Sequence, residues 1–107
     1  MRTIIQLMEL AVISAREGKD VLVCVPKHRD YSTIAGNFKV LFPNEKIERK
    51  GYEIKFDGGG SIKFHTPRMM MEGFQFDHVF VDSDTHYSEE CWAKVMAMLK
   101  ETGEVTK

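Results

Sequence analysis

The sequence predicts an α/β fold in three layers, with helices on both faces of a mostly parallel sheet that also carries a β-hairpin. Residues 21–25 and 78–81 are continuous apolar runs, which are typical of parallel strands buried on both faces. These runs alternate with segments whose apolar residues recur at helical spacing, the pattern of a layered α/β domain. Residues 52–56 and 61–65 instead alternate between apolar and polar side chains on either side of a glycine-rich turn, which predicts the hairpin.

The length and composition are those of one globular domain. The chain has 107 residues, of which 43% are hydrophobic and 29% charged. We expect one α/β domain over residues 1–101 and a flexible tail over residues 102–107. No apolar run is long enough to span a bilayer, and the segment from Met1 is a poor match to a signal peptide, so we expect a cytoplasmic protein. Cys24 and Cys91 lack metal-ligand spacing, and we expect both to be buried, reduced thiols.

The first half of the chain is predicted to form a helix, a strand and a second helix. Residues 3–17 carry a wide apolar stripe at helical spacing. Residues 20–25 form the strand, which a proline closes. Residues 31–42 show a weaker helical pattern, and Asp30 or Ser32 is expected to cap the N-terminus of this helix.

The second half is predicted to contain the hairpin, a buried strand and a last helix. Residues 52–57 and 61–65 are the two strands of the hairpin, and residues 47–49 are a candidate for an earlier strand. Residues 78–81 form a buried strand that ends at acidic residues. Ser88 begins the last helix, with glutamates in the first turn, where they favour the helix dipole.

Several of these segments, in this order, are similar to parts of RecA-like P-loop ATPases, such as helicases and the ATPase domains of viral terminases. The helix and strand up to Val25 resemble the unit that follows the phosphate-binding loop, and Pro26–Arg29 resembles its Pro-x-basic loop. Residues 54–64 resemble a hairpin of terminases, and Gly73–Asp82 is similar to their G-x-x-x-D-x-h-h-h-D stretch. The resemblance covers roughly residues 3–98 and implies a protein of phages or other mobile elements.

Two departures from this family bear on function. The G-x-x-x-x-G-K-[ST] loop that binds phosphate is absent from the sequence. Asp82 matches the metal-coordinating Asp of the family, but Ser83 stands where the family has the Glu that activates water. The resemblance therefore implies a P-loop-ATPase-like core that is not an enzyme and binds no cofactor. It also implies an open sheet edge beside residues 78–81, where the first helix or a second copy of the chain would pack.

The first functional hypothesis is a non-catalytic accessory or regulatory protein that acts through a protein partner. A domain that keeps the scaffold of an ATPase can compete with an active relative or regulate it. The contact surface would include the open edge, the loop residues Met69, Met70 and Met71, and the acidic C-terminal part of the chain. Methionine side chains are flexible and polarizable, which suits an adaptable contact, although they equally fill gaps in cores.

A second hypothesis is the binding of single-stranded nucleic acid. If the strands are parallel, the loops that follow them meet at the carboxyl edge of the sheet, where open α/β folds bind ligands. The resemblance places Lys27 and Arg29 in the loop with which helicases contact single-stranded DNA. Arg68 and Lys63 would extend the phosphate contacts, and Tyr31 would stack on a base. Further basic residues are available at Lys39, Lys46, Arg49 and Lys50. The net charge of −1 is not that of a dedicated nucleic-acid binder.

A third hypothesis is a metal-dependent enzyme. Asp82, Asp84 and His86 follow the buried strand and offer ligands for Mg²⁺, Mn²⁺ or Zn²⁺, with His65 as a further candidate. The same residue types are also common at solvated turns and helix caps, which is the alternative interpretation of this segment.

Overall fold

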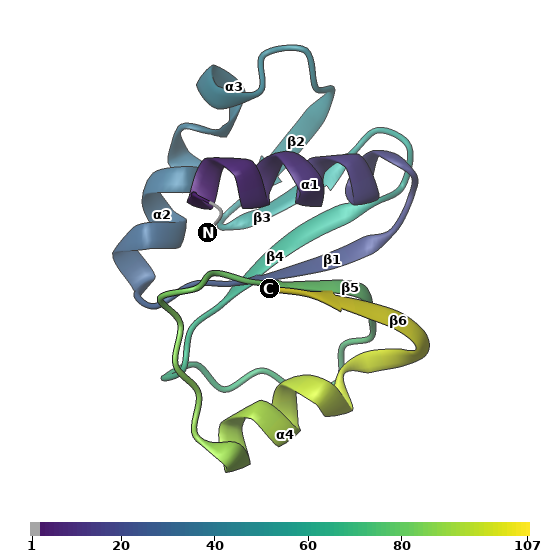
Figure 1. Cartoon of the computed structure of the whole chain (residues 1–107). Coiled ribbons are helices and arrows are strands. Elements are labelled where there is room, and N and C mark those ends of the chain that lie inside the picture. Colours follow the sequence, from purple (N-terminus) through teal and green to yellow (C-terminus); the bar gives the residue numbers. More distant parts are fainter. Residues whose placement is uncertain (1–2) are drawn as a thin grey trace.

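The computed structural model describes residues 3–107; Met1 and Arg2, where the expected domain and the segment tested for a signal peptide begin, lie outside the described residues. Along the described residues the elements are, in chain order (Figure 1), α1 (Ile4–Arg16), β1 (Asp20–Cys24), α2 (His28–Gly36), α3 (Phe38–Leu41), β2 (Ile47–Lys50), β3 (Glu53–Phe56), β4 (Ser61–His65), β5 (Phe76–Val81), α4 (Glu89–Ala97) and β6 (Leu99–Thr106). Within residues 3–107, no helix has the length and hydrophobicity needed to cross a bilayer.

All the strands belong to one sheet with the order β2-β3-β4-β1-β5-β6. β1 pairs in parallel with β4 on one side and with β5 on the other, and β5 pairs in parallel with β6. The β2–β3 and β3–β4 pairs are antiparallel. The mostly parallel sheet, the hairpin over residues 52–65 and the earlier strand beginning at Ile47 are therefore confirmed.

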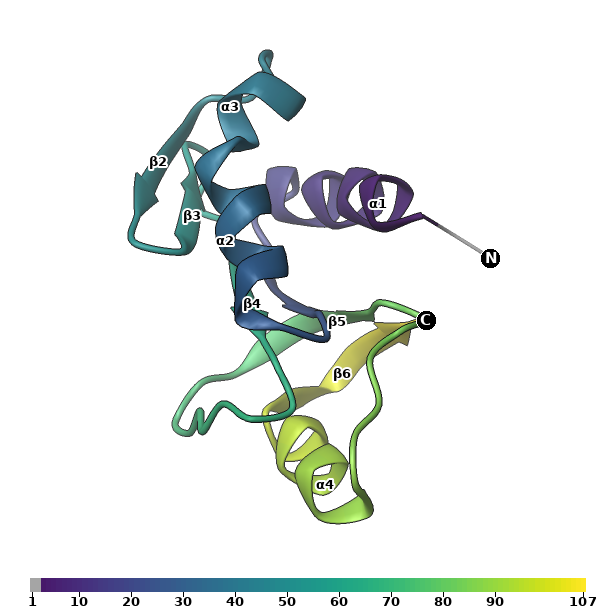
Figure 2. The same ribbon diagram turned by 90° about the vertical axis from the view of Figure 1, so that its left-hand side faces the viewer.

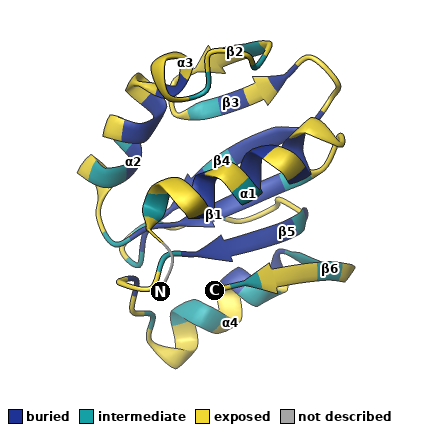
Figure 3. Cartoon of the chain, turned by 45° about the horizontal axis from the view of Figure 1, so that its top comes forward, coloured by how far each residue is buried: buried dark blue, intermediate teal, exposed yellow. Residues whose placement is uncertain are grey.

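Helices cover both faces of the sheet, as predicted (Figure 1 and Figure 2). α1, α2 and α3 pack on one face, in a core that includes Val23, Phe64 and Phe80. α4 packs on the other face, in a core that includes Leu22 and Val79. Figure 3 shows that β1 and β5 are buried along their length, whereas β2 and β6 are largely exposed. The continuous apolar runs follow from this position between two layers of helices.

The helix predicted over residues 31–42 is wrong in its bounds, because the structure has two helices there, α2 and α3. α2 starts earlier, at His28, and its N-cap is Lys27 rather than Asp30 or Ser32. The carboxylate of Asp30 instead accepts a hydrogen bond of 3.0 Å from the backbone N–H of Lys27. The start was missed because its first residues are charged and add nothing to the apolar period.

The C-terminal residues form a strand rather than the predicted flexible tail. β6 includes residues 102–106 and pairs with β5, with Thr106 opposite Phe80. The Nζ atom of Lys100 also lies 3.0 Å from a carboxylate oxygen of Asp77 on β5. This pairing covers the edge of β5 that was predicted to be open, so that prediction is wrong, and β2 and β6 are the edge strands. The charged sequence of β6 suits an edge strand, since charges discourage pairing with other chains.

His78 links α1, β5 and β6. Its Nδ1 atom lies 3.1 Å from the hydroxyl oxygen of Ser14 on α1, and its Nε2 atom lies 2.8 Å from the hydroxyl oxygen of Thr106 on β6. The ring also stacks on Phe80, with 3.9 Å between ring centres. Burial lowers the pKa of His78 from its ordinary value, so the neutral ring is favoured, with one nitrogen donating and the other accepting.

Gly60, at the end of the hairpin turn, lies against the backbone that joins α1 to β1. A Cβ atom at this position would collide with the carbonyl oxygen of Ala15 and lie 2.9 Å from the carbonyl oxygen of Lys19. We expect Gly60→Ala to lower the free energy of unfolding by about 3 kcal/mol or more, because the colliding atoms are backbone. In the control Gly36→Ala, the new Cβ meets nothing within 4 Å, and we expect a gain of about 0.5 kcal/mol. Urea denaturation measures both, and similar stabilities would contradict the close approach.

The buried His78 predicts a loss of stability in mild acid. Its folded-state pKa lies below the ordinary value of 6.5, so the unfolded chain takes up the proton first as the pH falls. The contribution of His78 is therefore complete above pH 6.5 and is lost as the pH falls from there through the folded-state pKa. The pKa of His65 is lowered by burial and adds to the same trend. Urea midpoints between pH 8 and pH 5 measure the effect, and a midpoint that stays constant or rises toward pH 5 would contradict it.

Candidate functional site

The residues that follow the parallel strands meet at one edge of the sheet, as predicted. β1, β4 and β5 run in the same direction, so their carboxyl ends lie together. Because β3 runs antiparallel to β4, the turn between β2 and β3 at Gly51 and Tyr52 lies at this edge too. The carboxyl edge of an open α/β sheet is where ligands bind in this class of fold, and it defines the candidate site.

Basic residues form the N-terminus of α2 at this edge. Lys27 is the N-cap, His28 and Arg29 are the first helical residues, and all three are exposed. The N-terminus of a helix carries a partial positive charge, so cationic side chains are unfavourable there. Asp30 offsets part of this charge through its hydrogen bond to the Lys27 backbone. The helix start is therefore a positive, solvent-facing group that an anion would stabilise.

Tyr31 lies beneath this helix start and is only 5% exposed, so the prediction that it stacks on a base is wrong. Its ring stacks on Phe64, with centroids 5.8 Å apart. The rings of His28 and Tyr52 contact its outer side, at centroid distances of 4.5 and 5.0 Å. Tyr52 is 43% exposed, so the accessible aromatic surface consists of His28 and Tyr52. Tyr52 was not predicted to be part of the site, because its alternation with Ile54 placed it among the inward-facing residues of the strand.

The two other predicted phosphate ligands do not join this group. The Nζ atom of Lys63 lies 3.4 Å from a carboxylate oxygen of Glu53 and 5.2 Å from the centre of the Phe74 ring. Lys63 is thus engaged on a strand, and its assignment to the binding surface is wrong. Arg68 is exposed in the loop after β4, where it borders a hollow with Lys94 of α4. Arg68 therefore lies on the α4 side of the sheet, away from α2.

The three consecutive methionines point to different surroundings. Met69 packs against the core beneath α1 and α2, whereas Met71 packs against the core beneath α4. Met70 is 83% exposed. Of the three methionines predicted to form a contact surface, Met70 is therefore the one that remains available. Met69 and Met71 hold the loop to the domain.

Asp82 directly follows β5 and lies between two hollows. The first, of about 630 Å³, lies between the starts of α1 and α2 and the loop after β5. The second, of about 320 Å³, lies beside α4, and we call it the α4 hollow. Its lining residues are Val81, Asp82, Ser83, Thr85, Tyr87, Glu89, Trp92 and Lys107. Burial raises the pKa of Asp82, and the nearby carboxylates of Asp84 and Asp30 raise it further.

The weak metal candidates Asp82, Asp84 and His86 do not form a cluster. Among the described residues 3–107, no group of three His, Cys, Asp or Glu side chains is placed to hold a metal ion. His86 is exposed, and the further candidate His65 is buried. The Nδ1 atom of His65 lies 2.8 Å from the hydroxyl oxygen of Tyr87, so this ring nitrogen of His65 already has a hydrogen-bond partner.

Both cysteines are free thiols, as expected, but Cys91 is only half-buried, so the prediction that both are buried is wrong for this residue. Cys24 is fully buried in β1, and burial raises the pKa of its thiol to about 12. A thiol with so high a pKa stays protonated near neutral pH and is a poor nucleophile. Cys24 therefore acts as a core residue.

Comparison of the sequence with protein-family models gives no match, and neither the search of curated proteins nor the search of solved structures returns one. The resemblance to RecA-like P-loop ATPases therefore stays a prediction. What the structure establishes is a mixed α/β domain with a six-stranded, mostly parallel sheet.

The crowding of carboxylates around Asp82 predicts a small gain in stability when its charge is removed. Because its folded-state pKa is raised above 3.8, Asp82 lowers the free energy of unfolding as the pH rises from 3.8 through the folded-state pKa, and this loss is complete above the folded-state pKa. We expect Asp82→Asn to raise the free energy of unfolding at pH 7 by less than about 1 kcal/mol, since solvent screens this partly buried group. The gain should vanish below pH 3.8. Glu48→Gln on exposed β2 is the charge-matched control for urea denaturation, and an equal gain there would contradict the local cause.

Proposed function

We propose that this chain is a non-catalytic accessory protein that binds single-stranded nucleic acid through an exposed surface at the carboxyl edge of the sheet. This surface, the basic-aromatic surface, consists of Lys27, His28, Arg29, Lys50 and Tyr52. The observation that carries the proposal is the placement of Lys27 and Arg29 at the positive end of α2, next to an exposed tyrosine ring. Phosphates compensate such a helix start, and tyrosine offers a base a stacking face.

The charges around the basic-aromatic surface favour one path for a bound nucleic-acid strand. Arg29 borders the hollow between α1 and α2, but Asp30, Asp82 and Asp84 line it as well, and their excess of negative charge would repel a phosphate chain from its interior. The turn between β2 and β3 instead carries Lys50 and Tyr52, both exposed. A bound nucleic-acid strand would therefore run from the start of α2 toward the turn between β2 and β3 and away from β5.

The proposal contains no hydrolytic step. P-loop ATPases, which the sequence resembles, have a glutamate that activates water at the position after the one matched by Asp82. This chain has Ser83 at that position. A serine hydroxyl lacks the basicity of a carboxylate, and Ser83 lies exposed in the loop after β5. The carboxyl edge would thus retain ligand binding without catalysis.

Fluorescence anisotropy of a labelled oligothymidylate tests the proposal at low and at physiological salt. We expect saturable binding that weakens as salt rises, because the lysine and arginine contacts release counterions. The double variant Lys27→Ala/Arg29→Ala should lose about tenfold or more in affinity and reduce the slope of log affinity against log salt by about 1.4, since each phosphate contact on a single strand contributes about 0.7. Tyr52→Ala should also weaken binding about tenfold, since it removes one stacking face.

The matched control is Lys19→Ala/Lys94→Ala, which removes the same charge. Lys19 lies at the opposite edge of the sheet beside Glu17, and Lys94 lies on α4. Both substituted side chains are exposed, so the fold should be retained. An equal loss in the control, or no binding by the unmodified protein at low salt, would overturn the proposal.

A further inference from the structure

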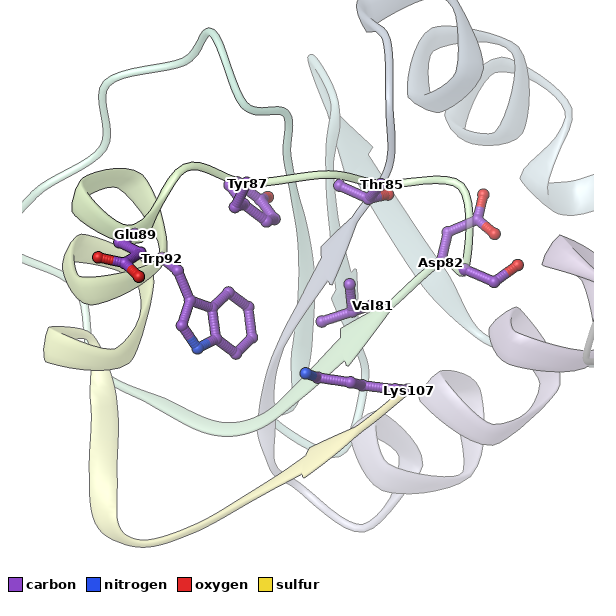
Figure 4. Close-up of a pocket in the computed structure, with 8 residues that line it drawn as sticks. Val81, Asp82, Thr85, Tyr87, Glu89, Trp92 and Lys107 are labelled. Atoms are coloured by element: carbon purple, nitrogen blue, oxygen red, sulfur yellow. The ribbon is translucent and has the colours of Figure 1, made fainter.

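The α4 hollow has an aromatic wall and carries an excess of acidic residues. Trp92 on α4 and Tyr87 just before it form this wall, with 5.7 Å between ring centroids. Asp82 and Glu89 also line the hollow, and Lys107 is the one basic residue among its lining residues in the described part of the chain. In Figure 4 the carboxylate of Asp82 is turned away from Trp92, and that of Glu89 lies on the outer side of α4, so both act on a ligand through their field.

A lysine of the chain itself already uses this hollow. The Nζ atom of Lys107 lies 5.1 Å from the centre of the Trp92 indole ring. Figure 4 shows the side chain reaching from the end of β6 across the opening, with its nitrogen directed at the indole. An ammonium over the face of a tryptophan is attracted by the electrons of the ring, and tryptophan is the best of the aromatic residues for this contact.

The shape and charge of the hollow are therefore matched to an alkylammonium group. The side chain of Lys107 spans the opening of the hollow, and its head group meets the indole face (Figure 4). One lysine neutralises only part of the negative charge contributed by Asp82 and Glu89. A neutral apolar ligand would gain the wall contact but not the attraction of the ring or of the carboxylates.

We infer that the α4 hollow is a binding site for a lysine side chain presented by a protein partner, and that Lys107 is an intramolecular occupant which this lysine displaces. The site is separate from the basic-aromatic surface in its residues and in the sign of its ligand. Because Lys107 must leave first, the unmodified protein binds an external lysine more weakly than a variant without this side chain.

Trp92 is the single tryptophan of the chain, so its fluorescence reports on this hollow alone. The experiment titrates Nα-acetyl-lysine N-methylamide into the unmodified protein and into Lys107→Ala. The norleucine amide, which has the same carbon chain without the ammonium, is the control ligand. We expect a saturable change of Trp92 emission with the lysine amide and none with the norleucine amide. Lys107→Ala should bind about three- to sixfold more tightly than the unmodified protein.

Lys55→Ala is the matched control variant. It removes an exposed lysine of β3 that does not line the α4 hollow, and it should bind like the unmodified protein. Glu89→Gln should weaken binding, because it removes a negative charge from the rim. The inference is overturned if Lys107→Ala shows no saturable change with the lysine amide, if the norleucine amide gives the same change, or if Lys107→Ala and Lys55→Ala bind equally. Lys27→Ala/Arg29→Ala should leave this titration unchanged, so the outcome is independent of nucleic-acid binding.

Discussion

β1 is hydrogen-bonded in parallel to β4 on one side and to β5 on the other, and the rest of the molecule depends on this arrangement. Residues 21–25 are completely buried, because helices cover both faces of the sheet at this strand. The parallel direction places the carboxyl ends of three strands side by side. In an antiparallel arrangement, the basic loop after β1 and the acidic loop after β5 would lie at opposite edges of the sheet.

The loop after β5 divides this edge into two surfaces of different character. The backbone N–H of Asp82 donates to the carbonyl oxygen of Cys24 at 3.0 Å, and the hydroxyl of Thr85 donates to the same oxygen at 3.1 Å. These hydrogen bonds hold the loop to the end of β1 and fix its position between the two surfaces. On one side lies the basic-aromatic surface with α2, and on the other lies the α4 hollow. An anionic strand and a cationic side chain could therefore be bound at the same time without contact.

The C-terminal strand connects the interior of the domain to the α4 hollow. The hydroxyl of Thr106 is hydrogen-bonded to the buried His78, which is also hydrogen-bonded to Ser14 of α1. Lys107 follows directly, so the position of its ammonium over Trp92 depends on how β6 is seated beside β5. The fold and the occupancy of the hollow are in this way physically linked.

The α/β class, the parallel core and the hairpin follow from the residues alone, because residues 21–25, 78–81 and 52–65 carry their strand signals within a few neighbours. The same signals placed the candidate site at the carboxyl edge. The folded structure was needed to show that residues 99–106 form a strand, since their polar sequence has no apolar period and their pairing with β5 is a long-range contact. It likewise decided that Tyr31 is buried and that Lys63 is engaged by Glu53. Residue type tells what a side chain can bind, but its accessibility depends on which distant elements pack against it.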